Sequence, residues 1–228
     1  MKTNKLWTRN FRLVILASGM GTLGTIAGSF ALSFLVFDET GSTLASALII
    51  AIQLLPYLLL PVLVAPFMDR LPRKSFLVAG DAANAVLIAG MGLWLLNFSF
   101  SYVGYLAVSL LLACLGAADE LAFTSIYPEL IPEGAEQKGY AVSSMLYPVL
   151  KVIMTPLAAI LLDTLGVAWI LIAQSGFSLA AAVTESFIRL DETERKHREP
   201  YSLRAWGNDI REAVQYLKKE RGLRSIYG

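Results

Sequence analysis

Six long apolar stretches, separated by short polar segments, occupy almost all of the chain between Arg12 and Ile188. They lie at residues 12–37, 44–67, 75–97, 102–126, 140–165 and 167–188. One helical crossing of a hydrocarbon core about 30 Å thick takes roughly 20 residues, and each stretch is at least that long. None of them alternates apolar and polar residues as the strands of a membrane barrel do, so the pattern predicts six membrane-spanning helices.

The composition agrees with a chain that lies in lipid. Of its 228 residues, 56% are hydrophobic and only 16% are charged, whereas a soluble domain averages about 25% charged residues. The formal net charge is +1, without the basic patch that marks nucleic-acid binding. Cys114 is the only cysteine, which excludes an intramolecular disulfide. These values indicate an integral membrane protein with membrane lipids, and no nucleic acid, as partners.

The basic leader before Leu13–Phe37 resembles the start of a signal peptide. A signal peptide has an apolar core of only about 7–15 residues and a cleavage site after it, so this longer run is interpreted as the first spanning helix. Basic residues gather before Arg12, in the segment 69–74 and after Ile188, whereas the intervening loops 38–43 and 98–101 have none. The positive-inside rule therefore predicts cytoplasmic termini in a multi-pass protein of the cell (plasma or inner) membrane.

The chain changes character near residue 190. We divide it into a six-helix transmembrane unit, 1–190, and a cytoplasmic segment, 191–228, that begins a central loop. Within this segment Ile210, Val214 and Leu217 recur at helical spacing among charged residues, which predicts a short amphipathic helix on the membrane or the bundle. A solvated connecting helix is the alternative.

Residues 65–74 read APFMDRLPRK and join the second stretch to the third. They resemble the loop between the second and third helices of the major facilitator superfamily. Asp69, Arg70, Arg73 and Lys74 match that family's pattern, whereas Ala65 and Pro72 replace its two glycines. The resemblance implies a gating loop that locks the two halves of a transporter. Ordinary positive-inside charges would explain the three basic residues but not the aspartate.

The resemblance extends over residues 6–226 and implies the N-terminal half of a twelve-helix fold, built from two inverted three-helix repeats. Pro61 before Asp69 and Pro156 before Asp163 stand at nearly the same separation, as such repeats would produce. The turns FDETGST at 37–43 and YPELIP at 127–132 are similar to those of the drug, macrolide and siderophore efflux branch. The arginine of many drug antiporters is missing from the fourth stretch, so coupling through it is not expected.

Charged residues within the apolar stretches are the candidates for substrate binding or ion coupling, because burying a charge in lipid is costly. Lys151 lies near the middle of the fifth stretch and is expected to face a central cavity, where it could attract an anion or pair with an acid. Asp81, Asp119 and Glu120 lie nearer the cytoplasm; they are either an interfacial salt-bridge set or coupling groups. Gln53 could line the cavity or bridge helices.

Other patterns argue against catalysis. Residues 19–24 spell a dinucleotide-binding motif, but no strand precedes it, and Gly24 with Gly28 instead predicts a close helix contact. His197 is the only histidine. No metal cluster and no nucleophile–base pair can be assembled, so we expect no enzyme activity and no cofactor.

The sequence therefore predicts an all-α secondary transporter that exports small amphipathic molecules, such as an antiporter, by alternating access. Its partners would be a small-molecule substrate and a second six-helix half, supplied either by a covalent C-terminal half or by another copy of the chain. A membrane scaffold or partner-binding subunit is the alternative from another class, and a membrane enzyme ranks third.

Overall fold

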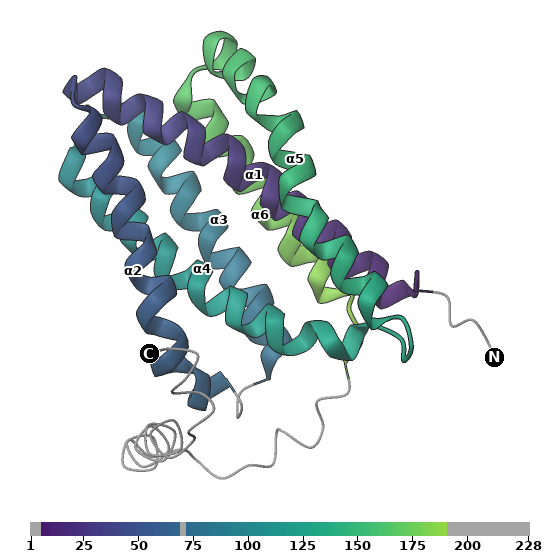
Figure 1. Ribbon diagram of the computed structural model, residues 1–228. Helices are drawn as coiled ribbons and strands as arrows, with labels where there is room; N and C mark the ends of the chain where they lie inside the picture. The colour runs from purple at the N-terminus through teal and green to yellow at the C-terminus, as the bar shows by residue number, and fades with distance from the viewer. Residues whose placement is uncertain (1–5, 69–71, 191–228) are drawn as a thin grey trace, which may run out of the picture.

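The computed structural model describes residues 6–68 and 72–190, which form six helices and, within these ranges, no strand (Figure 1). The helices are α1 (Arg9–Thr40), α2 (Thr43–Met68), α3 (Arg73–Asn97), α4 (Tyr102–Leu130), α5 (Glu136–Leu165) and α6 (Val167–Ser186). All six are long and apolar enough to cross a membrane. The predicted all-α bundle of six spanning helices is confirmed, and the protein is a multi-pass membrane protein.

Capping residues, rather than the ends of the apolar stretches, decide where several helices begin and end. The Thr8 side chain accepts a hydrogen bond from the backbone N–H of Phe11, so α1 begins before the apolar stretch does. It continues to Gly41, whose positive φ of 63° provides the left-handed conformation of a helix end. The predicted helix boundaries were therefore a few residues too short at both ends of α1.

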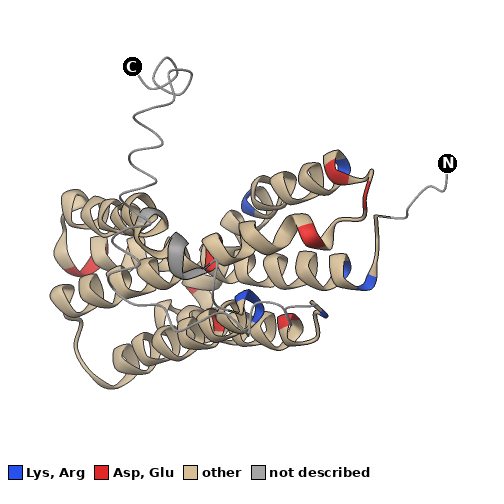
Figure 2. Cartoon of the chain, turned by 90° about the horizontal axis from the view of Figure 1, so that it is seen from below, with Lys and Arg blue, Asp and Glu red and all other residues tan. Residues whose placement is uncertain are grey.

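Most of the helical ribbon carries no charged residue (Figure 2). Many large apolar side chains are exposed, among them Leu58 and Val152 at 72% and 76%, and α2 and α5 are the least buried helices. Such surfaces are compatible with lipid or another apolar helix and incompatible with water. The predicted cytoplasmic segment 191–228 lies outside the described residues, so that boundary and the amphipathic helix stay predictions.

The most extensive helix contacts correspond to one another as two three-helix repeats would produce, whereas the smaller contacts of α1 with α2 and of α5 with α6 have no counterpart of similar extent. In such repeats α1 corresponds to α4, α2 to α5 and α3 to α6. The contact of α1 with α6 then corresponds to the contact of α4 with α3. In the same way, the contact of α1 with α5 corresponds to that of α4 with α2, and the extensive contact of α3 with α6 corresponds to itself. Figure 1 shows α1 beside α5 and α6.

Two apolar clusters close the bundle toward its two ends. One packs Phe11 of α1 against Tyr127 and Leu130 of α4, and the other packs Val36 of α1 against Met91 of α3 and other helices. Glycines bring helices close between these clusters: Gly24 and Gly28 lie against Gln174 of α6. The predicted close helix contact at these glycines is confirmed. Polar residues are concentrated between the two clusters.

Candidate transport cavity

A cavity of about 640 Å³ lies within the bundle and is lined by residues of all six helices. Its polar lining consists of Ser18, Thr22, Thr25 and Ser29 of α1, Gln53 and Tyr57 of α2, Asp81 and Asn84 of α3, Ser109, Asp119 and Glu120 of α4, Ser143, Ser144 and Tyr147 of α5, and Gln174, Ser178 and Glu185 of α6. Ionisable side chains are rare inside membrane bundles, so this lining makes the cavity the candidate site for a polar ligand.

The hydroxyls of α1 form one stripe along the cavity. Ser18, Thr22, Thr25 and Ser29 recur at intervals of three or four residues, so they share one face of the helix. The neighbouring helix α6 contributes the amide of Gln174. The cavity can therefore donate hydrogen bonds to a ligand and accept them from it along much of its length.

Three helices bring carboxyl groups together at one part of this cavity. Asp81 of α3, Asp119 of α4 and Glu185 of α6 lie within electrostatic range of one another, and Glu120 interacts with Asp119 in the same way. Glu185 is only 4% exposed. One oxygen of Glu185 and one of Asp119 are buried without a hydrogen-bond partner in the described structure. The cavity thus has a strongly acidic region.

Two glycines make room for this region. A Cβ atom at Gly80 of α3 would lie 3.1 Å from Oδ1 of Asp119, so the missing side chain lets the carboxyl approach α3. A Cβ atom at Gly116 of α4 would lie 2.6 Å from the hydroxyl of Tyr57, a contact too short for a real side chain. The two glycines therefore let the carboxyl of Asp119 approach α3 and the hydroxyl of Tyr57 approach α4.

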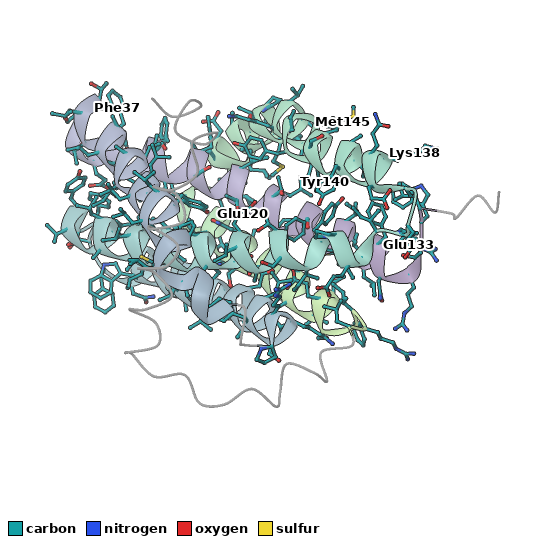
Figure 3. The ribbon with its side chains drawn as sticks, turned by 60° about the horizontal axis from the view of Figure 1, so that its bottom comes forward. Phe37, Glu120, Glu133, Lys138, Tyr140 and Met145 are labelled. Carbon is teal, nitrogen blue, oxygen red and sulfur yellow. The ribbon has the colours of Figure 1, made fainter. Side chains whose placement is uncertain are left out.

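The interpretation of Asp81, Asp119 and Glu120 as an interfacial salt-bridge set was wrong. None of the three forms an ion pair with a described residue, and Asp81 and Asp119 line the cavity from inside the bundle. Figure 3 shows Glu120 midway along the bundle, away from Glu133 at one end and Phe37 at the other. These side chains stay candidates for coupling, and their position in the cavity is compatible with that role.

Glu185 is a cavity residue that the sequence analysis did not include among its candidates. Its position two residues beyond Val183, near the end of the last apolar stretch, predicts an interfacial carboxylate. It is buried because α6 packs against both α1 and α3, and the face that carries Glu185 also carries the buried Ser178 and Ala182. The spacing of these small residues at intervals of three or four was a signal that this face points inward.

Gln53 lines the cavity, whereas Lys151 is not among the lining residues. Lys151 is exposed in the middle of α5, and its Nζ lies 5.3 Å from the ring centre of Tyr147, which does line the cavity. The predicted role of Lys151 in a central cavity stays a prediction, since Lys151 is exposed and is not among the residues that line this cavity.

Two of the four predicted gating residues can be placed. Arg73 donates a hydrogen bond of 2.8 Å to the backbone carbonyl of Ser125 and forms an ion pair of 3.4 Å with Glu129, both in α4. Lys74 donates to the carbonyl of Ser186, the last residue of α6. Asp69 and Arg70 lie outside the described residues. The basic side chains at the start of α3 therefore connect it with the ends of α4 and α6.

Among the described residues, no group of three or more histidine, cysteine, aspartate or glutamate side chains is arranged so that it could hold a metal ion. Six helices that are apolar enough to span a membrane surround a cavity with a polar lining, an arrangement typical of membrane transporters. The Major Facilitator Superfamily model matches residues 13–227 of the chain. The protein therefore belongs to this family of membrane transporters, whose members move solutes rather than catalyse reactions.

One curated relative is the uncharacterized MFS-type transporter YvqJ of Bacillus subtilis (strain 168), which is 27% identical over 150 residues. The aligned part covers 62% of this chain and 34% of the relative, so the chain spans about a third of that transporter. No solved structure matches the chain.

Proposed function

We propose that the protein is one half of a secondary active transporter that exports small amphipathic molecules by alternating access. The observation that carries this proposal is the cavity of about 640 Å³, which opens polar and acidic side chains to a ligand inside an apolar bundle. A scaffold has no need of such a cavity, because unpaired buried polar groups cost stability. Family membership supports transport, and the mixed hydroxyl, carboxyl and aromatic lining supports an amphipathic substrate.

A second six-helix half would complete the transporter. It would come from a covalent C-terminal half or from another copy of the chain, and it would cover the exposed apolar faces of α2 and α5. Rocking of the two halves about the cavity would then expose the binding site to each side of the membrane in turn.

The loop 69–74 would control this movement. Arg73 and Lys74 connect the start of α3 with the ends of α4 and α6, so a change at the loop would be transmitted to three helices at once. Asp69 and Arg70 are proposed to bind the second half when the cytoplasmic side is closed, as their match to the family pattern implies.

The coupling ion is proposed to be the proton, carried by Asp119 and Glu120 in the cavity. The test uses proteoliposomes made with the 228-residue chain and, separately, with the complete gene product. A pH gradient should drive accumulation of a fluorescent amphipathic dye, and the double variant Asp119→Asn/Glu120→Gln should lose this accumulation.

The matched control replaces Glu39 and Glu133, two exposed carboxylates outside the cavity, with glutamine and should leave accumulation unchanged. Accumulation that survives in the Asp119/Glu120 variant would remove the coupling role of these residues. Failure of the complete protein to move any dye, together with the absence of a ligand-dependent change in its thermal stability, would favour the scaffold or partner-binding alternative.

A further inference from the structure

The charged side chains that line the cavity all have one sign. They are Asp81 of α3, Asp119 and Glu120 of α4, and Glu185 of α6, and the lining contains no lysine, arginine or histidine within the described ranges. The two basic residues at the start of α3 contact other groups: Arg73 contacts Ser125 and Glu129 of α4, and Lys74 contacts the end of α6. An anion entering this cavity would meet carboxylates and no counter-charge.

Glu185 supplies independent support for a ligand. It is 96% buried, faces the cavity, and has a side-chain oxygen without any hydrogen-bond partner in the described structure. Asp119 has a second such oxygen, and the hydroxyl of Ser109, 1% exposed, is a third unpartnered group on the same cavity. Native proteins leave few buried polar atoms unpaired, so each of these atoms calls for a partner that the described residues do not supply.

Aromatic rings beside the carboxyls suit an organic cation. Tyr57 lies within electrostatic range of Asp119 and Glu120, and Tyr147 lines the cavity from α5. The Lys151 ammonium lies 5.3 Å from the Tyr147 ring centre, a distance at which a ring face attracts a cation. Lys151 is not among the residues that line the cavity, whereas four carboxyls are.

We propose that the cavity selects organic cations over anions, and that the charged nitrogen of the ligand lies among Asp119, Glu120 and Glu185. The apolar part of the ligand would pack against Phe123 and Leu112, which line the same cavity, and its polar groups would meet the hydroxyl stripe of α1. This proposal names the substrate class of the proposed transporter. It rests on the proposed transport function only for the claim that the bound cation is also moved across the membrane.

A pair of ions that match in shape and differ in charge tests the proposal. Tetraphenylphosphonium and tetraphenylborate are compared for binding to the 228-residue chain in nanodiscs of zwitterionic lipid, with empty nanodiscs subtracted. The phosphonium should bind saturably and the borate should not. Glu185→Gln and Asp119→Asn should each raise the Kd of the phosphonium about tenfold or more, because each removes a carboxyl that can carry a negative charge beside the bound cation.

Glu133→Gln is the matched control, because Glu133 is an exposed carboxylate at one end of the molecule (Figure 3). It should leave the Kd unchanged. Circular dichroism of each variant confirms that it keeps the helical content of the parent chain. Equal binding of the two ions, no phosphonium binding above empty nanodiscs, or equal effects of the Glu185 and Glu133 variants would each overturn the proposal.

Transport is measured separately, so the two proposals fail in different ways. Selective phosphonium binding without any solute movement by the complete protein would leave the cation site standing and remove the transport function. Movement of neutral or anionic solutes without selective phosphonium binding would keep the transport function and remove the cation site.

Discussion

At the scale of single residues, polar side chains in this bundle follow two different rules. Hydroxyl groups mostly bind backbone carbonyls: Thr155 donates to Lys151, one turn earlier, and Tyr105 donates to Met91 of the neighbouring α3. Such groups are satisfied by the bundle itself and need nothing from a ligand. Asp119 and Glu185 are different, because each has a buried oxygen that nothing in the described structure satisfies.

Arg73 shows how a partly buried cation differs from its exposed partner. Its side chain is 12% exposed, whereas that of Glu129 is 46% exposed. We expect Arg73→Gln to lower the stability of the chain by about 1–3 kcal/mol, because it removes a charged hydrogen bond to the carbonyl of Ser125 as well as the ion pair. Glu129→Gln should cost less than about 1 kcal/mol, since solvent screens the exposed half of the pair.

Thermal unfolding midpoints of the two variants in the same detergent check this order. A loss in Glu129→Gln as large as that in Arg73→Gln would show that the ion pair, rather than the bond to the α4 backbone, connects the loop with α4.

At the scale of helices, close approach of α3 to α6 is the central packing feature. Gly92 of α3 permits it, because a Cβ atom there would lie 3.0 Å from the carbonyl oxygen of Ala168 and 2.9 Å from the side chain of Ile172. Backbone atoms cannot rotate away as a side chain can. The helices α3 and α6 belong to different halves of the six-helix bundle, so their contact joins the two halves. It also positions the cavity walls that each helix contributes.

Replacing Gly92 with alanine should therefore destabilise the bundle. We expect a loss of about 1–3 kcal/mol from overpacking against the backbone of α6. Gly90→Ala is the matched control on the same helix, because no atom lies within 4 Å of the Cβ position there. It should be neutral or stabilising by up to about 1 kcal/mol, since alanine favours a helix more than glycine does.

Thermal unfolding of the detergent-solubilised variants measures both effects. If Gly92→Ala melted at the temperature of the parent chain, the tight contact of α3 with α6 would be refuted. A large loss in Gly90→Ala would instead show that another chain or helix covers this face.

At the scale of the whole molecule, the sequence was sufficient for the number and kind of helices and insufficient for the cavity. Apolar length alone predicts six spanning helices, because lipid requires each segment to satisfy its own backbone. Which faces of those helices point inward is decided by packing between segments far apart in the chain. Glu185 lies close to Asp81 only because α6 packs on α3, so its burial could not be read from its position near the end of a stretch.

Lys151 illustrates the same limit from the other side. Its depth in the fifth stretch was predicted from counting residues, and it does lie in the middle of α5. The groups that surround Lys151 depend on what packs against its face of α5, and the sequence does not specify that packing. The acidic residues of the loop after α4 were equally uninformative about orientation, because the positive-inside rule counts only lysine and arginine.

The orientation in the membrane is the remaining prediction at this scale. Basic residues flank the ends of the helices near the N-terminus and at 69–74, and none lies in the loop 98–101 between α3 and α4. We therefore expect Ser99 to face the outside of the cell and Glu133 to face the cytoplasm. Both residues are exposed, and they lie in the segments that follow α3 and α4.

Single cysteines at these two positions, introduced after Cys114→Ser has removed the native thiol, give a direct measurement. A membrane-impermeant maleimide added to intact cells should label Ser99→Cys and spare Glu133→Cys, and permeabilisation should make the second position reactive. Glu39→Cys, in the loop after α1, is the control and should behave as Ser99→Cys does. Labelling of Glu133→Cys in intact cells would show that the molecule has the opposite orientation in the membrane. Arg73 and Lys74 would then lie outside the cell, which would remove the basis for a cytoplasmic gating loop.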